Sequence, residues 1–181
     1  MTALVAPDLS RWQPWAAMVE DFGGPDEMHG SGYWHLDGDP VPTRTGCAAF
    51  VTMTEATSTA DLDGTRVPST YFWIAAQDGA PGDDLVGFLH LRHTLNEWLF
   101  EQGGHIGYSV RPAARRRGHA SRALALGVSA AARLGIDRVL VTCDVGNDAS
   151  RRTIEAGGGR FEDERQGKLR FWIPCDGPTA G

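Results

Sequence analysis

The sequence predicts an α/β fold, in which a central sheet is flanked by helices. Short apolar runs at 71–76, 85–92 and 138–143 are typical of strands. The Ala- and Leu-rich stretch 121–133 is typical of a helix. A strand-like run at 105–110 leads into this helix through a turn rich in arginine, so the two kinds of element alternate along the chain.

The first predicted element is a helix with Ser10 as its cap, which carries its aromatic side chains on one face and ends at Gly23-Gly24-Pro25. A loop follows at 29–42. The other elements, in chain order, are a helix at 45–57, a hairpin of strands 71–76 and 85–92 across the turn 77–84, a short helical piece at 95–100, the strand 105–110, a helix from Gly118, the strand 138–143, a helix at 148–156, and strands near 160–163 and 169–173.

The composition indicates one globular domain over residues 1–181, with a short Gly- and Pro-rich tail at 176–181. No apolar run approaches the roughly 20 residues that span a bilayer, and the N-terminus lacks the basic start of a signal peptide. The three cysteines have neither paired nor metal-binding spacing. We therefore expect a cytoplasmic protein with no membrane partner and no metal, and a homodimer is compatible with the sequence.

Charge is divided unevenly along the chain. Residues 1–104 hold 15 acidic and 4 basic side chains, whereas residues 105–181 hold 8 acidic and 13 basic ones. The basic half suits an anionic cofactor, and the acidic half favours a cationic amine over nucleic acid as partner. The alternative is that the acidic residues only keep the surface soluble.

The turn between Val110 and Ala120 has the features of an anion site. Gly118 lets the backbone come close to a ligand, and the N-terminus of the following helix presents free N–H groups with the positive end of the helix dipole. Arg115, Arg116 and Arg117 add charge that can pair with phosphate oxygens. The alternatives for three consecutive arginines are a solvated patch or a nucleic-acid contact.

The pattern Val-x-Pro-x-x-Arg-x-x-Gly-x-Ala at 110–120 resembles the acyl-coenzyme A pyrophosphate loop of the GNAT superfamily of N-acetyltransferases. Downstream, Asn147-x-x-Ser150-x-x-x-Ile154-Glu155 is similar to a second motif of that superfamily, in which the Asn contacts the pantetheine arm. Asn147 is also placed to cap a helix, whatever else it does.

The resemblance implies a GNAT fold, with a mixed, largely antiparallel sheet that splays at the cofactor site. It also implies acetyl-coenzyme A as the acyl donor, an acceptor-side half at 1–104 and an acyl-coenzyme A-binding half at 105–175. The implied cofactor-binding residues are Tyr108, Ser109, Val110, Arg115, Arg116, Arg117, Gly118, His119, Ala120, Asn147 and Ser150.

The reaction needs a base for the amine and a proton for the leaving thiolate. His105 is the leading candidate base, because an imidazole suits this task near neutral pH. Glu97 and Glu101 are alternatives, and a purely structural role for His105 is another reading. Related enzymes often carry a Tyr that acts as the general acid, and the matching position in this chain is Ile154. Tyr108 is the candidate substitute, with bulk water as the alternative proton source.

Trp34, Arg92 and Asn96 are candidate acceptor-binding residues, together with His35. Arg92 could bind an acceptor carboxylate or pair with a nearby acid, and Trp34 could instead be a packed anchor under its loop. The expected function is direct acetyl transfer to the primary amine of a small molecule. A protein or peptide N-acetyltransferase and a non-catalytic acyl-coenzyme A-binding module are the alternatives.

Overall fold

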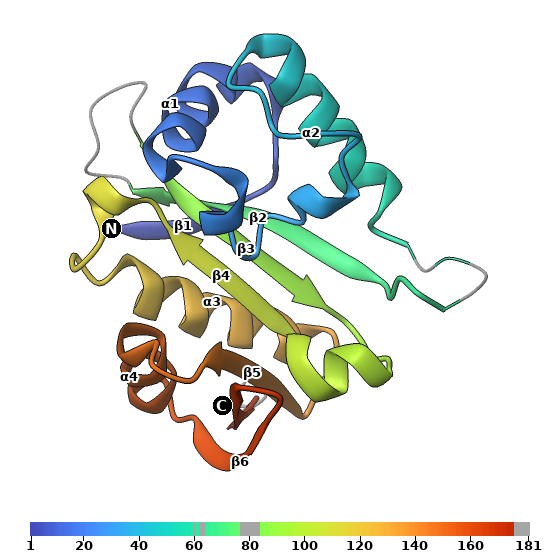
Figure 1. The fold of residues 1–181 in the computed structure, drawn as a ribbon, viewed down its shortest axis with the longest axis vertical. Coiled ribbons are helices and arrows are strands. Elements are labelled where there is room, and N and C mark those ends of the chain that lie inside the picture. Colours follow the sequence, from blue (N-terminus) through green and yellow to red (C-terminus); the bar gives the residue numbers. More distant parts are fainter. Residues whose placement is uncertain (60, 62–63, 77–83, 176–181) are drawn as a thin grey trace.

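The computed structural model describes residues 1–59, 61, 64–76 and 84–175. In these residues seven strands form one sheet in the order β1-β2-β3-β4-β5-β7-β6 (Figure 1). The strands are β1 (Thr2–Val5), β2 (Ser69–Ala76), β3 (Leu85–Arg92), β4 (Ile106–Val110), β5 (Arg138–Asp144), β6 (Arg160–Arg165) and β7 (Lys168–Pro174). The predicted α/β fold with a mixed, largely antiparallel sheet and flanking helices is confirmed.

The sheet changes character between β4 and β5. All other neighbours pair in antiparallel fashion over four or more residues, whereas β4 and β5 run parallel and share one register pair, Ile106 with Val141, in the described residues. The two strands therefore part after Ile106, as the sequence predicts.

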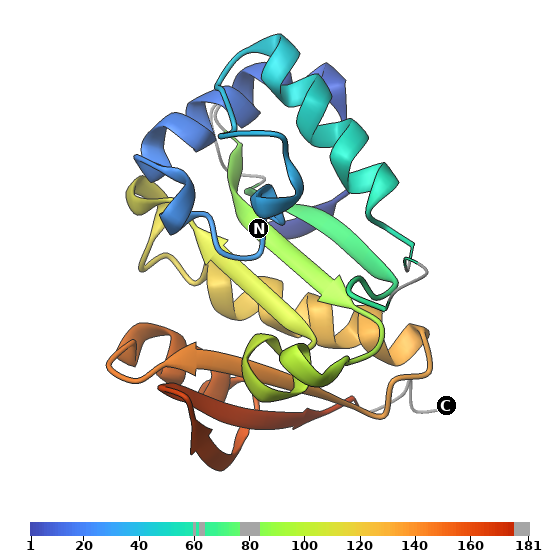
Figure 2. The ribbon, with the colours of Figure 1, turned by 45° about the vertical axis from the view of Figure 1, so that its right-hand side comes forward.

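Helices cover both faces of the sheet. They are α1 (Trp12–Phe22), α2 (Arg44–Ala56), α3 (His119–Arg133) and α4 (Asp148–Ala156). Figure 2 shows α1 and α2 on one side of the sheet and α3 on the other. One apolar cluster packs Trp15, Phe22 and Phe50 of the first pair against Trp73 and Phe88. A second cluster packs the faces of α3 and α4 against the opposite side of the sheet.

Local sequence explains most helix ends. Thr43 accepts a hydrogen bond from the Gly46 N–H and so caps α2, and Gly23 ends α1 with φ of 76°. The cap predicted at Ser10 is wrong: Asp8 accepts from the Ser10 N–H and caps the short 3-10 helix Leu9–Arg11, after which α1 begins. The Asp8 carboxylate lies two positions nearer the chain start than Ser10, and its oxygen accepts from the exposed amide of Ser10 itself.

Two other expectations differ from the structure. The sequence analysis missed β1, a half-buried edge strand whose four residues pair with the end of β2. The helical piece expected at 95–100 lies further on, ending in a π-helical turn, Leu99–Gly103. The predicted hairpin turn and the C-terminal tail lie largely outside the described residues. No helix in the described part of the chain is long and apolar enough to cross a membrane.

Candidate functional site

A cavity of about 210 Å³ opens where β4 and β5 part. The β4 side contributes Gly107 and Tyr108, and the β5 side contributes Thr142, Cys143 and Asp144. Asn147 and Ser150 at the start of α4 close one end, while Trp34, Arg92 and Trp98 line the other. We call this space the splay cavity. Two sequence-predicted groups meet in it: Tyr108 from the strand before the first motif, and Asn147 with Ser150 from the second motif.

The turn that leads into α3 presents backbone to solvent. Arg116 and Gly118 both have left-handed backbones, with φ of 63° and 81°. Left-handed residues in a turn can direct backbone N–H groups toward one side, where they can bind an anion. Gly118 is the residue before α3 and has no side chain to cap it, so the first-turn amides of the helix remain available to a ligand.

The three arginines of this turn differ in their contacts. The Arg115 Nε donates to the Val110 carbonyl at 2.9 Å, and its Nη2 lies 3.5 Å from a Glu27 carboxylate oxygen. Arg116 and Arg117 are exposed beside the turn. Arg115 therefore braces the loop, and the other two provide charge at its rim.

Not every predicted cofactor residue presents its side chain to this site. The His119 ring is buried beneath the turn, where its Nδ1 lies 2.9 Å from the Thr2 hydroxyl. The Ser109 hydroxyl is buried without a partner in the described structure, and Val110 belongs to the core. Ala120 is half-buried and packs against the same core. These four residues can contribute backbone groups to the site, whereas their side chains serve packing.

Three of the predicted cofactor-binding residues, Tyr108, Asn147 and Ser150, lie close together at the start of α4. The Asn147 side chain accepts a hydrogen bond from the Ser150 N–H at 3.0 Å, which confirms that it caps the helix. The Tyr108 hydroxyl lies 3.0 Å from the Ser150 hydroxyl. Burial raises the pKa of Tyr108 to about 12, and its contact with Ser150 only partly opposes this effect. The phenol is therefore neutral and carries its proton into the splay cavity.

The His105 ring makes a structural hydrogen bond and does not line the splay cavity. Its ring Nδ1 accepts a hydrogen bond from the Leu140 N–H at 2.9 Å. The backbone N–H of His105 donates to the Leu140 carbonyl at 2.7 Å. Burial, with a smaller contribution from nearby Arg92, lowers the pKa of His105 to about 4. The residue ties β4 to β5 just before they part and does not line the splay cavity.

Neither glutamate alternative lines a cavity: Glu97 is exposed, and Glu101 pairs with Arg165 at 2.6 Å. An exposed histidine, His29, does line the splay cavity beside Gly30. A Cβ on Gly30 would lie 2.3 Å from the Gly107 carbonyl oxygen, so this loop crosses directly over β4. The sequence analysis missed His29, because no periodicity in the loop indicates that it returns to the sheet.

A second cavity, of about 170 Å³, lies beside the first, and Trp34, Arg92 and Trp98 line both. We call it the acceptor-side cavity. Its floor follows from the register of β2 and β3, in which Trp73 faces Phe88 in the core, Tyr71 faces His90, and Ser69 faces Arg92. The residues on one face of β2 and β3 are thus apolar where they pack against α1 and α2, and polar beyond these helices.

The four predicted acceptor residues, Trp34, His35, Arg92 and Asn96, all line the acceptor-side cavity, in different ways. Arg92 is buried, and its Nη1 donates to the carbonyls of Gly103 and Gly104 at 2.9 and 3.1 Å. Burial lowers its pKa to about 10, so the guanidinium keeps its charge at neutral pH. Trp34 is 47% exposed and donates from its Nε1 to His35 at 3.1 Å.

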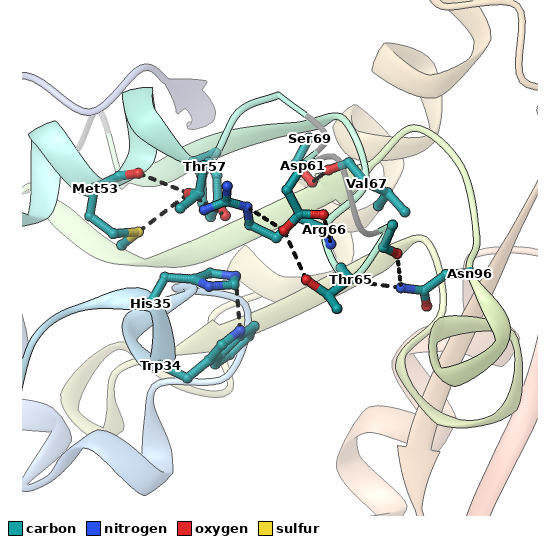
Figure 3. Close-up of polar contacts among 12 residues, drawn as sticks. Trp34, His35, Met53, Thr57, Asp61, Thr65, Arg66, Val67, Ser69 and Asn96 are labelled. Atoms are coloured by element: carbon teal, nitrogen blue, oxygen red, sulfur yellow. Dashed lines mark hydrogen bonds and ion pairs between the residues drawn. The ribbon is translucent and has the colours of Figure 1, made fainter.

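Asn96 acts mainly as a structural clamp. Its side-chain oxygen accepts from the Leu99 N–H, and its amide nitrogen donates to the carbonyls of Gly64 and Thr65 (Figure 3). The same loop is closed by Asp61, which bonds Thr65 and pairs with Arg66 at 3.2 Å. The wall of the cavity is therefore a bonded network rather than a set of free polar groups.

Metal chemistry has no support from the geometry, since no group of three or more His, Cys, Asp or Glu side chains comes together in the described residues.

Solved structures of acetyltransferases match this chain over nearly its whole length. Matches to solved structures, each at probability 1.00, include RimL, a ribosomal L7/L12 α-N-protein acetyltransferase in complex with coenzyme A, at 17% identity and a TM-score of 0.63, covering 96% of this chain and 93% of that one. They also include the Microcin C7 self-immunity acetyltransferase MccE with acetyl-CoA and AMP, at 12% identity and 0.62, covering 96% and 92%.

A third match is a ribosomal-protein-S5-alanine acetyltransferase from Vibrio fischeri, at 14% identity and a TM-score of 0.61, covering 97% of this chain and 92% of that one. At these identities the matches speak for the fold. A comparison with curated protein sequences gave no match.

The sequence itself matches the profile of the Acetyltransferase (GNAT) family over residues 42–158. This span includes β2 to β5, the anion-binding turn and α4, and so contains both sides of the splay cavity. The chain therefore belongs to the GNAT acetyltransferase family, whose enzymes use acetyl-coenzyme A as acyl donor.

Proposed function

We propose that this protein transfers an acetyl group directly from acetyl-coenzyme A to the primary amine of a small molecule. The observation that carries the proposal is the junction of the two cavities, where Trp34, Arg92 and Trp98 line both the splay cavity and the acceptor-side cavity. An amine in the second space has a short path to an acyl group in the first. Holding two reactants in this way supplies much of the rate enhancement of a bimolecular transfer.

The residues present fit acetyl-coenzyme A. The turn at 115–118 and the uncapped start of α3 would hold the diphosphate, with Arg116 and Arg117 at its rim. The unpaired edge of β4 and the Asn147 amide would hold the pantetheine arm. When bound, the coenzyme supplies a thioester acetyl group that is activated toward amines.

Within the splay cavity we assign proton chemistry to two groups. Tyr108, neutral and bonded to Ser150, would donate the proton that the departing thiolate needs. His29, exposed at the opposite edge of the same cavity, would take a proton from the incoming ammonium directly or through water. His105 would remain a structural tie between β4 and β5.

The size of the acceptor-side cavity favours a small molecule. Its volume of about 170 Å³ is close to the roughly 150 Å³ of an engineered protein cavity that binds benzene. A protein or peptide acceptor is the second candidate, because RimL and the Vibrio fischeri protein are named for acetylation of ribosomal proteins.

The test is release of free thiol on mixing the purified protein with acetyl-coenzyme A and a panel of amines, amino acids and short peptides. Turnover with small amines supports the proposal, and turnover with peptides alone supports the second candidate. Binding of acetyl-coenzyme A with no thiol release from any acceptor would instead identify a non-catalytic binding module.

The role of Tyr108 is tested by Tyr108→Phe. We expect kcat to fall by about 10²-fold, as is typical of losing a general acid, with little change in the KM for acetyl-coenzyme A. Tyr33→Phe, which removes a phenol outside both cavities, is the control. An unchanged kcat in Tyr108→Phe would leave water as the proton source.

We further propose that residues 1–181 form one domain, in which residues 1–104 bind the acceptor and residues 105–175 bind the coenzyme. All described residues that line the acceptor-side cavity come from the first part. A cytoplasmic location is supported by the buried thiols of Cys47 and Cys143, which are typical of proteins kept in a reducing compartment.

A further inference from the structure

We propose that the acceptor is a free amino acid with a single-ring side chain, whose carboxylate binds Arg92 and whose ring lies in the acceptor-side cavity. This inference rests on the proposed function and specifies its substrate class. It distinguishes a free amino acid from an amine without an acid group and from the N-terminus of a protein, which has no carboxylate next to its amine.

Arg92 is the first observation. Its side chain is buried, and in the described residues it pairs with no carboxylate; only its Nη1 is used, by the carbonyls of Gly103 and Gly104. No hydrogen bond in the described structure uses the hydrogens on Nε and Nη2. A buried cation without a counter-ion is costly, and a guanidinium edge matches a carboxylate with two parallel hydrogen bonds. An acceptor carboxylate would complete this arrangement.

The charge around Arg92 points the same way. The first 104 residues hold 15 acidic and only 4 basic side chains, yet two of those four, Arg66 and Arg92, line the acceptor-side cavity. None of its described lining residues is acidic. Asp61 pairs with Arg66 and leaves Arg92 unneutralised. Within an acidic region the cavity is thus locally basic.

Aromatic rings line part of the acceptor-side cavity. The rings of Tyr71 and His90 stack with centroids 4.1 Å apart and an angle of 17°, and Trp34 lies over His90 at 6.4 Å. Both nitrogens of His90 are buried without a partner in the described structure, although the residue lies in the cavity wall. Burial, with nearby Arg92, keeps the pKa of His90 well below its usual value, so the ring is neutral.

This floor suits a ring by shape and by size. Aromatic rings prefer offset-stacked or edge-to-face contact with other rings, and the volume of about 170 Å³ has room for one six-membered ring. Tyr71 is fixed by a 2.9 Å bond to the Thr57 hydroxyl, which in turn donates to the Met53 carbonyl (Figure 3). The floor is therefore preorganised by α2.

The position of Arg92 then sets the position of the amine. Arg92 lines both cavities, and its Nη1 lies 3.7 Å from the point where a Cβ on Gly107 would stand, at the first step of the splay. A carboxylate on Arg92 with a ring in the acceptor-side cavity leaves the adjacent α-amine beside the splay cavity, within reach of the acyl group.

The test compares phenylalanine, phenylalanine amide and 2-phenylethylamine as acceptors for the wild-type protein. We expect kcat/KM for phenylalanine to exceed that of the other two by at least 30-fold. In Arg92→Met the value for phenylalanine should fall by a similar factor, and by much more than that for 2-phenylethylamine. Arg92→Lys, which keeps the charge without the planar fork, should lie between.

Because Arg92→Met also removes two structural bonds, binding of phenylalanine to the wild-type protein saturated with coenzyme A is measured separately by calorimetry. Binding of phenylalanine but not of the amide supports the inference even if no acceptor is acetylated, an outcome that would defeat the proposed function instead. Equal turnover with all three compounds overturns the inference while the proposed function stands. Failure of phenylalanine both to bind and to react overturns it as well.

Discussion

The splay cavity with its turn and the acceptor-side cavity recognise ligands by different means. On the donor side the groups available to a ligand are mainly backbone: the turn at Arg116 and Gly118, the uncapped start of α3 and the unpaired edge of β4. On the acceptor side they are side chains, chiefly Arg92 and the stacked pair of Tyr71 and His90. We therefore expect donor binding to depend on chain path, and acceptor binding on side-chain identity.

This contrast has a consequence for substitutions. Donor-side side chains mostly pack or brace, so changing them should alter stability more than chemistry, whereas a change that covers the backbone should alter affinity. Acceptor-side changes should alter specificity, as in the comparison of phenylalanine with its amide above. The predictions below test the donor half of the contrast, from the largest expected effect to the smallest.

Ile154→Ala should have the largest effect on stability. Ile154 is the fully buried residue of α4 and belongs to the core cluster. Truncation of such a residue costs about 3 kcal/mol. The free energy of unfolding from urea titration measures this loss. Leu126→Ala on the exposed side of α3 is the control, and its expected effect is within about 0.5 kcal/mol. A pH profile of turnover that shifts in Ile154→Ala while stability is unchanged would contradict a packing role.

His105→Phe should come next, with a loss of about 2 kcal/mol at pH 7, because it leaves the buried Leu140 N–H without its acceptor. The pH dependence has a defined sign. The folded pKa of about 4 lies below the usual value near 6.5, so the contribution of His105 is complete above pH 6.5 and is lost as pH falls toward 4. The difference between wild type and variant should therefore narrow over this interval.

Urea titrations of both proteins at pH 7 and pH 5 measure this narrowing. The same variant distinguishes a structural role of His105 from a catalytic one. If the role is structural, the acid limb of the pH profile of kcat should not shift. An acid limb that disappears in His105→Phe would restore His105 as the catalytic base.

The sequence predicted the donor side well because its determinants are local. Pro112, Gly118 and Asn147 each impose a backbone conformation or a cap within a few residues of themselves, and the parting of β4 and β5 was implied by the resemblance of the two motifs to the GNAT superfamily. Tyr108 and Ser150 were each predicted, but their 3.0 Å contact was not, since it joins residues 42 positions apart.

The acceptor side was predicted only in part, because its determinants are distant in sequence. Arg92 and Trp34 were named as candidates, whereas the burial of His90 against Tyr71 follows from the register of β2 and β3 and was not predicted. His29 reaches the splay cavity only because a loop crosses β4. Such contacts depend on strand register and loop path, which local patterns do not encode.

Gly118→Ala should weaken coenzyme A binding about tenfold, or about 1.4 kcal/mol, because a methyl group at φ of 81° strains the turn and covers its amides. Gly135→Ala is the matched control: Gly135 has φ of 77°, lies at the other end of α3 and has no neighbour within 4 Å of its Cβ position. Both variants should lose similar stability, and only Gly118→Ala should lose affinity in calorimetry. Equal affinity loss in both would point to a general effect on α3.

Arg116→Gly should have the smallest effect, and it probes the contrast most directly. The substitution removes a positive charge from the rim of the turn but relieves a left-handed backbone at φ of 63°, which costs an ordinary residue about 1 kcal/mol. An exposed ion pair contributes at most about 1 kcal/mol, so coenzyme A affinity should fall less than fivefold while the melting temperature rises. Arg117→Ala, which removes a neighbouring charge, should weaken binding by a similar small factor without this rise. A loss above 30-fold in Arg116→Gly would mean that side-chain charge, not backbone, dominates diphosphate binding, and the two cavities would then recognise their ligands in the same way.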